Sequence, residues 1–260
     1  MVFIFFKGGP KSGWIVFYPL EWLFSFFTDT LITINDEDYA LAKKHMHANK
    51  VVKINGIGVD VKNKWLVTDA ERKNARHSIR QELNIPEDAF LLSSVGELSD
   101  RKNHRVVLEA LRLMSDDELS NIYYVIAGTG NNGDLLRNFA QTFNFENHFH
   151  LLGYRSDIDD INYASDVSIF PSLREGLGVA GLDATVDGTY LLGTKKRGVS
   201  DYIRDDVNGN LFAPDSPEEL NQLIRKCLMD TPKTKHFDFL KCFDYGKVDK
   251  VMTEIYGGYE

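Results

Sequence analysis

Apolar and polar positions over residues 59–240 predict strands that alternate with helices. Short runs rich in Val, Ile and Leu alternate with longer segments whose apolar residues recur on one helical face. The predicted strands are 90–95, 123–127, 149–152, 167–170, 190–192 and 211–212, and the predicted helices are 105–114, 134–143, 158–164, 178–185, 199–203 and 218–229. This order is typical of βαβ units with right-handed crossovers. It predicts a doubly wound α/β domain whose parallel sheet has helices on both faces.

The chain before residue 59 has a separate pattern. Residues 30–34 and 51–54 predict two strands, with a helix over 36–44 between them. The loop 55–58 follows and contains two glycines, which tolerate positive φ, so we place a domain junction there. Further helices are predicted over 70–83 and 248–256.

Residues 14–27 form an apolar run dense in Trp and Phe. The run is too short to cross a bilayer and contains Pro19 and Glu21. Two interpretations stay open: a helix of the core, or a helix that faces a membrane surface or a partner. Residues 1–6 are also apolar but lack the basic region and cleavage site of a signal peptide, so secretion is unsupported.

Composition and charge narrow the class of protein. The 260 residues are 43% hydrophobic and 26% charged, as expected of a globular chain that can bury a core. A net charge of −8 argues against general electrostatic binding of nucleic acid. The two cysteines, Cys227 and Cys242, match no metal or redox spacing, so we expect a reducing compartment.

The loop after the first predicted strand of the α/β domain suits a phosphate ligand. Ligands of an open parallel sheet bind beyond the carboxyl ends of its strands. This loop begins at Gly96 and carries two adjacent cations, Arg101 and Lys102. A planar guanidinium beside a compact ammonium can hold two phosphates at once. The alternative is a solvated surface pair.

Two other loops give weaker signals. Gly153, Tyr154 and Arg155 follow the third strand, where their backbone could approach a flat base; an ordinary turn is the alternative. The turn from Gly128 to Gly130 is not the dinucleotide fingerprint, because no helix begins immediately after it. A nicotinamide-dependent enzyme is therefore disfavoured.

The loop after the fourth strand is the sharpest signal. It contains Glu175, Gly176, Leu177 and Gly178 and enters a helix that carries Asp183. The glycines leave backbone N–H groups bare at a helix start, where the helix dipole attracts a diphosphate. The two carboxylates are acceptors for hydroxyl groups, so the loop suits the diphosphate of a polyol.

Taken in order, four segments resemble the retaining glycosyltransferases of family four, which have the GT-B fold. The likeness is greatest to bacterial enzymes that build capsular polysaccharide or exopolysaccharide. The segments are SSVGELSDRKNH (93–104), HLLGYRSDI (150–158), ASDVSIFPSLREGLGVAGLDA (164–184) and RGVSDYI (197–203).

The resemblance implies three parts. Residues 1–58 would be a remnant of the acceptor-side domain, and residues 59–240 a Rossmann-like domain that binds a nucleotide sugar. Residues 241–260 would form a helix that returns toward the first part. The implied reaction transfers a sugar from a nucleoside-diphosphate donor with retention, without a cofactor or a metal.

The resemblance also implies roles at matching positions. Arg101 and Lys102 would contact the diphosphate, Glu175 the sugar and Asp183 the ribose. Asp183 stands where the family has Glu, and Tyr190 stands where it has Pro. No catalytic residue can be assigned, because residues 2–6 carry no histidine.

The family's early strands have no counterpart in this sequence, so we expect the isolated chain to be weakly active or inactive. The alternative is a non-catalytic module that binds a nucleotide sugar or a partner. The expected partners are a nucleotide sugar, a membrane surface or lipid-linked acceptor, and a partner chain or second copy, with no nucleic acid. The expected location is cytoplasmic, peripheral at the inner face of the membrane.

Overall fold

The structure is a computed structural model that describes residues 13–233 and 235–257. The prediction made for residues 1–6, and the missing histidine there, lie outside the described residues. The chain divides into two compact units. One takes in the chain up to Val61 together with the stretch from Phe239 onward, and the other is Lys62–Asp238.

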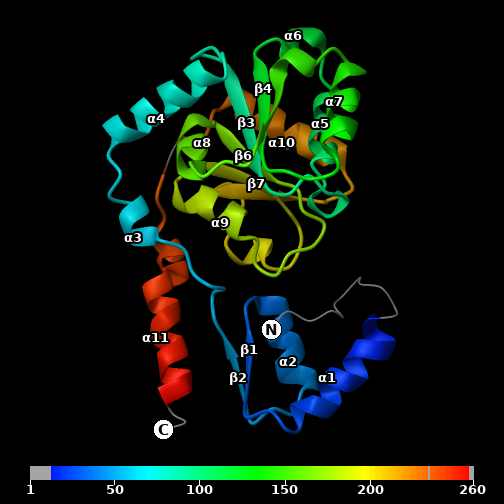
Figure 1. Ribbon diagram of the computed structural model, residues 1–260, viewed down its shortest axis with the longest axis vertical. Helices are drawn as coiled ribbons and strands as arrows, with labels where there is room; N and C mark the ends of the chain where they lie inside the picture. Colours follow the sequence, from blue (N-terminus) through cyan, green and yellow to red (C-terminus); the bar gives the residue numbers. More distant parts are fainter. Residues whose placement is uncertain (1–12, 234, 258–260) are drawn as a thin grey trace. The chain divides into compact units, whose positions relative to one another are not determined.

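The larger unit is built on a six-stranded sheet in the order β5-β4-β3-β6-β7-β8, with all neighbouring strands parallel (Figure 1). Its strands are β3 (Phe90–Val95), β4 (Ile122–Ala127), β5 (Phe149–Gly153), β6 (Val167–Phe170), β7 (Tyr190–Thr194) and β8 (Gly209–Phe212). Every strand predicted for this region is present. The predicted parallel α/β sheet is confirmed.

Helices cover both faces of this sheet. The helices of this part of the chain are α3 (Val61–Lys64), α4 (Asp69–Glu82), α5 (Arg105–Leu111), α6 (Asp116–Leu119), α7 (Gly133–Gln141), α8 (Ile158–Ala164), α9 (Val179–Val186) and α10 (Pro217–Met229). Short 3₁₀ turns are η2 (Asp100–Lys102), η3 (Glu146–His148) and η4 (Val199–Asp201). The short helix predicted over 199–203 is thus a 3₁₀ turn.

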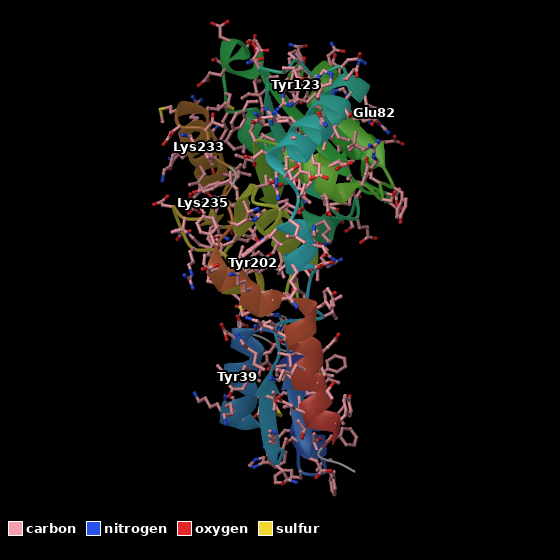
Figure 2. All side chains as sticks on the ribbon, turned by 90° about the vertical axis from the view of Figure 1, so that its left-hand side faces the viewer. Tyr39, Glu82, Tyr123, Tyr202, Lys233 and Lys235 are labelled. Atoms are coloured by element: carbon pink, nitrogen blue, oxygen red, sulfur yellow. The ribbon has the colours of Figure 1, made fainter. Side chains whose placement is uncertain are left out.

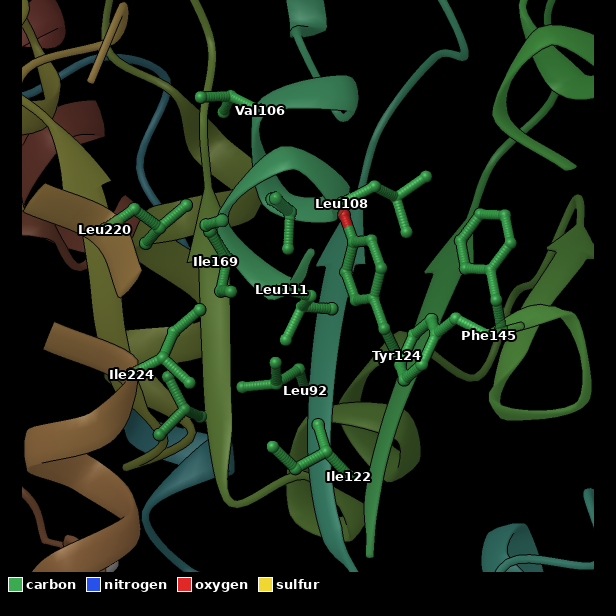
Figure 3. Close-up of a cluster of buried hydrophobic side chains, with 14 of the residues drawn as sticks. Leu92, Val106, Leu108, Leu111, Ile122, Tyr124, Phe145, Ile169, Leu220 and Ile224 are labelled. Carbon is green, nitrogen blue, oxygen red and sulfur yellow. The ribbon is translucent and has the colours of Figure 1, made fainter. Parts of the chain in front are cut away.

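Alternating side chains of the strands form one core on each face, because successive strand residues point to opposite sides. Leu91 packs in the cluster that includes α4 and α8. Its neighbour Leu92 lies in the opposite cluster with Tyr124, Ile169 and Ile224, against α5, α7 and α10 (Figure 3). Burial on both faces explains why these strands appear in the sequence as continuous apolar runs.

The strand order defines a switch point. From β3 the chain continues to β4 and β5 on one side of the sheet, whereas β6, β7 and β8 extend the other side. The loops that leave β3 and β6 therefore diverge from two neighbouring strands. Open parallel sheets bind their ligands in the crevice at such a point.

The smaller unit contains one βαβ element. Strands β1 (Thr30–Thr33) and β2 (Lys50–Lys53) pair in parallel, joined by α2 (Asp36–His45). The other elements are η1 (Gly13–Phe17), α1 (Tyr18–Ser25), η5 (Asp238–Phe243) and α11 (Tyr245–Tyr256).

The C-terminal helix joins this unit through main-chain hydrogen bonds to Val59. The Val59 N–H donates to the Phe243 carbonyl at 2.9 Å, and the Tyr245 N–H donates to the Val59 carbonyl at 3.0 Å. Gly58 has φ +79°, and a Cβ there would lie 2.4 Å from Tyr245 Cα. Glycine is therefore required at this close approach.

The aromatic run 14–27 is only marginally a core element. Trp14 and Tyr18 pack against the small cluster of Leu31, Ala42 and Met46. Most of its other large side chains are exposed, including Phe24 at 61% and Phe27 at 82%. Interpreting the whole run as a core helix is thus wrong. Among the described helices, none has the length and apolar character that crossing a bilayer demands.

We expect this exposed surface to make the protein self-associate at tens of micromolar, because large apolar patches attract partners. Static light scattering should show species larger than a monomer for the 260-residue chain. Replacing Phe24 and Phe27 with Ser should shift it toward the monomer. The matched control, Ser at the isolated exposed positions Leu66 and Met229, should leave the association unchanged. A clean monomer of the unaltered chain would count against the expectation.

Candidate functional site

The loops that leave β3, β6 and β7 are tied together at the switch point. The Leu173 N–H donates to the Arg101 carbonyl at 2.9 Å, which links the loops after β6 and β3. Thr194 Oγ1, at the end of β7, donates to the Ser172 carbonyl at 2.7 Å. The three strand ends therefore hold these loops in a common position.

Arg101, Lys102 and Glu175 meet where these loops join. Glu175 Oε1 accepts from Lys102 Nζ at 2.6 Å, from Ser172 Oγ at 2.7 Å and from Arg101 Nη1 at 3.1 Å. The side chains of Lys102 and Glu175 are only 14% and 12% exposed, whereas Arg101 is 48% exposed. A solvated surface pair therefore does not describe Lys102.

Close backbone approach explains the glycine at position 128, in the loop after β4. The Lys102 side chain passes over Gly96, where a Cβ would lie 3.4 Å from Lys102 Cδ. A Cβ at Gly128 would lie 1.9 Å from the Gly96 carbonyl oxygen. The turn from Gly128 to Gly130 thus serves packing of the loops against each other, in agreement with the absence of a dinucleotide fingerprint.

The start of α9 lies directly after Glu175 in the chain and is not capped by a side chain. Gly178 occupies the N-cap with φ +83°. Its carbonyl accepts from Tyr202 Oη at 3.0 Å, and a Cβ there would lie 2.8 Å from Phe170. The Leu177 side chain is buried. The Gly176 carbonyl oxygen lies so close to Gly198 that a Cβ at position 198 would be 2.3 Å from it. The helix start therefore combines a positive dipole end with a narrow, glycine-lined approach.

Gly153, Tyr154 and Arg155 lie outside this cluster, at the end of β5, which is an edge strand two strands from β3. Tyr154 is 83% exposed. The Arg155 guanidinium pairs with Glu82, near the end of α4 (Figure 2), and with Asp157 at 2.6 Å. The hydrogen bonds that Arg155 donates to the Glu82 and Asp157 carboxylates raise its pKa. The third loop is thus engaged in local ion pairs.

Asp183 faces a buried ion cluster that sequence reasoning missed. Lys64 Nζ lies 2.5 Å from Asp159, 2.9 Å from Asp187 and 3.4 Å from Asp183. Asn162 Nδ2 also donates to Asp187 at 2.7 Å. Lys64 comes from the four-residue helix α3, which has no readable periodicity, so no local signal in the sequence could have found this contact.

The cluster perturbs the ionisation of its members. Burial raises the pKa of Asp187 to about 7, against the opposing pull of Lys64. Burial likewise raises the pKa of Asp183, and Lys64 again opposes the rise. Burial disfavours the charged form of Lys64 too, but the carboxylates of Asp187 and Asp183 outweigh it and raise the pKa of that ammonium. Lys64 therefore stays protonated, and it lies beside the carboxyl groups of Asp183 and Asp187, whose pKa values are raised.

The chain belongs to the group 1 glycosyltransferases. The family model described as "Glycosyl transferases group 1" matches residues 75–238, which is more than half of the chain and includes the whole Arg101, Lys102 and Glu175 cluster. The predicted family is thereby confirmed.

Two curated relatives of this chain are named as glycosyltransferases. EpsD of Bacillus subtilis (strain 168), named as a glycosyltransferase, is 34% identical over 211 residues, covering 81% of this chain and 54% of EpsD. The UDP-Gal:alpha-D-GlcNAc-diphosphoundecaprenol alpha-1,3-galactosyltransferase of Escherichia coli is 29% identical over 220 residues, which cover 83% of this chain and 55% of that protein. The chain thus spans about half the length of the curated relatives it matches.

Solved structures confirm the fold. The Anabaena protein HepE, in complex with UDP-glucose, superposes with a TM-score of 0.80 at 20% identity, covering 97% of this chain and 69% of HepE. WaaG, a glycosyltransferase involved in lipopolysaccharide biosynthesis, gives a TM-score of 0.70 at 23% identity, and the match covers 87% of this chain and 62% of WaaG. These likenesses establish the predicted α/β GT-B fold.

Proposed function

We propose that this chain binds a nucleoside-diphosphate sugar at the switch point between β3 and β6, as part of a retaining glycosyltransferase of capsular polysaccharide or exopolysaccharide biosynthesis. One observation carries the proposal: two adjacent cations and a carboxylate, Arg101, Lys102 and Glu175, converge beside the uncapped start of α9. A diphosphate needs cations and backbone donors, and a sugar needs a hydroxyl acceptor. This place offers all three.

Ligand binding at this place would exchange partners. The diphosphate would take Arg101 and Lys102 from Glu175, and the released carboxylate could then accept from the sugar hydroxyls. As the bond from the sugar to the diphosphate breaks, negative charge grows on the departing phosphate oxygen. Cations fixed in position beforehand stabilise that charge without reorganisation.

The comparisons support a uridine nucleotide and a membrane-bound acceptor. HepE is solved with UDP-glucose, and the E. coli relative is named for a UDP-Gal donor and a diphosphoundecaprenol acceptor. By this analogy we place the protein in the cytoplasm, at the inner face of the membrane. A donor site alone does not position the acceptor hydroxyl, and such positioning contributes about 7 to 11 kcal/mol of a barrier. We therefore expect slow transfer by these 260 residues alone.

A second function, a non-catalytic module that binds nucleotide sugar and a partner, is favoured by the exposed apolar surface around α1. A transfer assay with labelled nucleotide sugar and membrane lipid extract separates the two functions. Transfer that appears only when membranes are added would favour a partner that supplies the acceptor side.

Calorimetry of the purified chain with uridine, guanosine and adenosine diphosphate sugars tests the proposal. We expect one nucleotide class, uridine, to bind with a stoichiometry near one. Absence of binding by all three classes would reject the function.

Glu175→Gln should reduce affinity for the nucleotide sugar by about tenfold and should leave affinity for the bare nucleoside diphosphate unchanged or higher. The amide keeps the size of the side chain but no longer holds Arg101 and Lys102 through an ion pair, so both cations become available to phosphate. Paired titrations with UDP-glucose and UDP measure the difference. Equal losses for the two ligands would remove Glu175 from the sugar-binding role.

A further inference from the structure

The Asp183 carboxylate is held from one side only. Within the described residues, Lys64 is its one ion-pair partner, at 3.4 Å from Oδ1. The Asp183 side chain keeps 27% of its surface exposed, whereas Lys64 is 10% exposed and Asp187 is fully buried. Oδ1 thus meets the buried ammonium, while about a quarter of the side-chain surface stays open to a ligand.

From this geometry we propose that Lys64 is a positioning residue that keeps Asp183 ionised and oriented to accept the ribose hydroxyls of the bound nucleotide. The inference rests on the proposed function, because it assumes that a nucleotide occupies the switch point. It goes further because it assigns a role to Lys64, a residue of α3 that lies far before the loop after β6 in the sequence.

Several charged groups surround the Asp183 carboxylate. Burial favours the protonated form of Asp183, and the negative charge of Asp159 acts in the same direction. Asp187 competes with Asp183 for Lys64. Tyr163 Oη hydrogen bonds to Asp187 at 3.3 Å, and Arg72 stacks on the Tyr163 ring at 4.3 Å. Directly after η4, Tyr202 stays neutral because burial raises its pKa well above the ordinary value.

Within the described residues, Lys64 is thus the one cation whose side chain forms ion pairs with the carboxylates of Asp159, Asp183 and Asp187. An ionised carboxylate accepts from two hydroxyls, whereas a protonated one gives up part of that capacity. Without Lys64, burial and Asp159 would act unopposed, and Asp183 would take up a proton at a higher pH.

Lys64→Met tests the role through the pH dependence of UDP affinity. The ratio of variant to wild-type Kd cancels the titration of the ligand itself. We expect this ratio to stay within about twofold near pH 8.5 and to rise to about fivefold as the pH is lowered to 6, because the variant's Asp183 takes up a proton more readily than the wild type's. Lys64→Arg keeps the charge and should restore the wild-type profile. Inorganic pyrophosphate, which has no ribose, should bind the variant and the wild type equally at both pH values.

A second pair of proteins keeps the test valid if the single variant unfolds. Without Lys64, the fully buried carboxylate of Asp187 would have no ion-pair partner among the described residues and would destabilise the fold. Asp187→Asn removes that charge. Comparing Asp187→Asn with Lys64→Met/Asp187→Asn should give the same rise of the Kd ratio at low pH. A ratio that does not change with pH, or an equal loss of pyrophosphate binding, would overturn the positioning role alone. Failure of the wild-type chain to bind UDP would overturn the proposed function as well.

Discussion

Replacing Arg101 and Lys102 together with Ala should weaken UDP binding by about a hundredfold, because each charge-assisted contact to phosphate is worth about 1.5 to 3 kcal/mol. Glu175 offsets part of this attraction in the free protein, since it holds both cations. We therefore expect each single variant to lose roughly tenfold. Lys102 should matter more than Arg101, because its less exposed charge is less screened by water.

Isothermal titration of UDP into each variant measures these losses. Arg137→Ala/Lys226→Ala is a matched control that removes the same charge from exposed positions, where the side chains pair with Asp134 and Asp206. That control should bind UDP as the wild type does. An unchanged affinity of the Arg101 and Lys102 double variant for UDP would show that neither side chain contacts the diphosphate.

Arg80→Met should lower the free energy of unfolding by about 3 to 5 kcal/mol, because it removes one cation from a buried ion pair and leaves several buried carbonyl groups unpaired, although Arg76 still pairs with Asp166 at 3.0 Å. Arg80 is fully buried. Its guanidinium donates to the carbonyls of Pro86 at 2.8 Å and Ala89 at 2.9 Å, and to Asp166 at 2.9 Å. It thereby joins α4 to the turn before β3 and to the turn before β6.

Denaturant unfolding followed by circular dichroism measures this loss. Arg137→Met is the control, because the Arg137 side chain is more than half exposed and pairs with Asp134 in the same helix. It should change stability by less than about 0.5 kcal/mol. A loss below about 1 kcal/mol for Arg80→Met would show that water or neighbouring groups replace its hydrogen bonds.

The fold of the larger unit was predictable because its signals are local. Buried parallel strands such as Phe90–Val95 are continuous apolar runs, and Ile158–Ala164 has the bounds that its helical pattern predicts. Elements of four residues, such as Val61–Lys64 and Asp116–Leu119, were missed, since so short a segment contains too little periodicity to detect.

The candidate site was predictable only in part. The loop motifs identify Arg101, Lys102 and Glu175 from their positions after strands, and the strand order brings them together. The partners of Asp183 and Arg80 could not be found in this way, because they depend on contacts between side chains far apart in the chain. The exposure of Phe24 and Phe27 was equally hidden, since aromatic density does not reveal what covers a helix.

A crystal structure of the chain with UDP tests the central claim most directly. The account predicts a diphosphate in hydrogen-bond contact with Lys102 and the first N–H groups of α9, with Glu175 released from both cations. A competing place in the larger unit is a cavity of about 700 Å³ lined by residues that include Arg72, Arg76 and Lys233, beside the amino ends of β6 and β7. UDP bound in that cavity, with the Arg101, Lys102 and Glu175 ion pairs intact, would contradict the account.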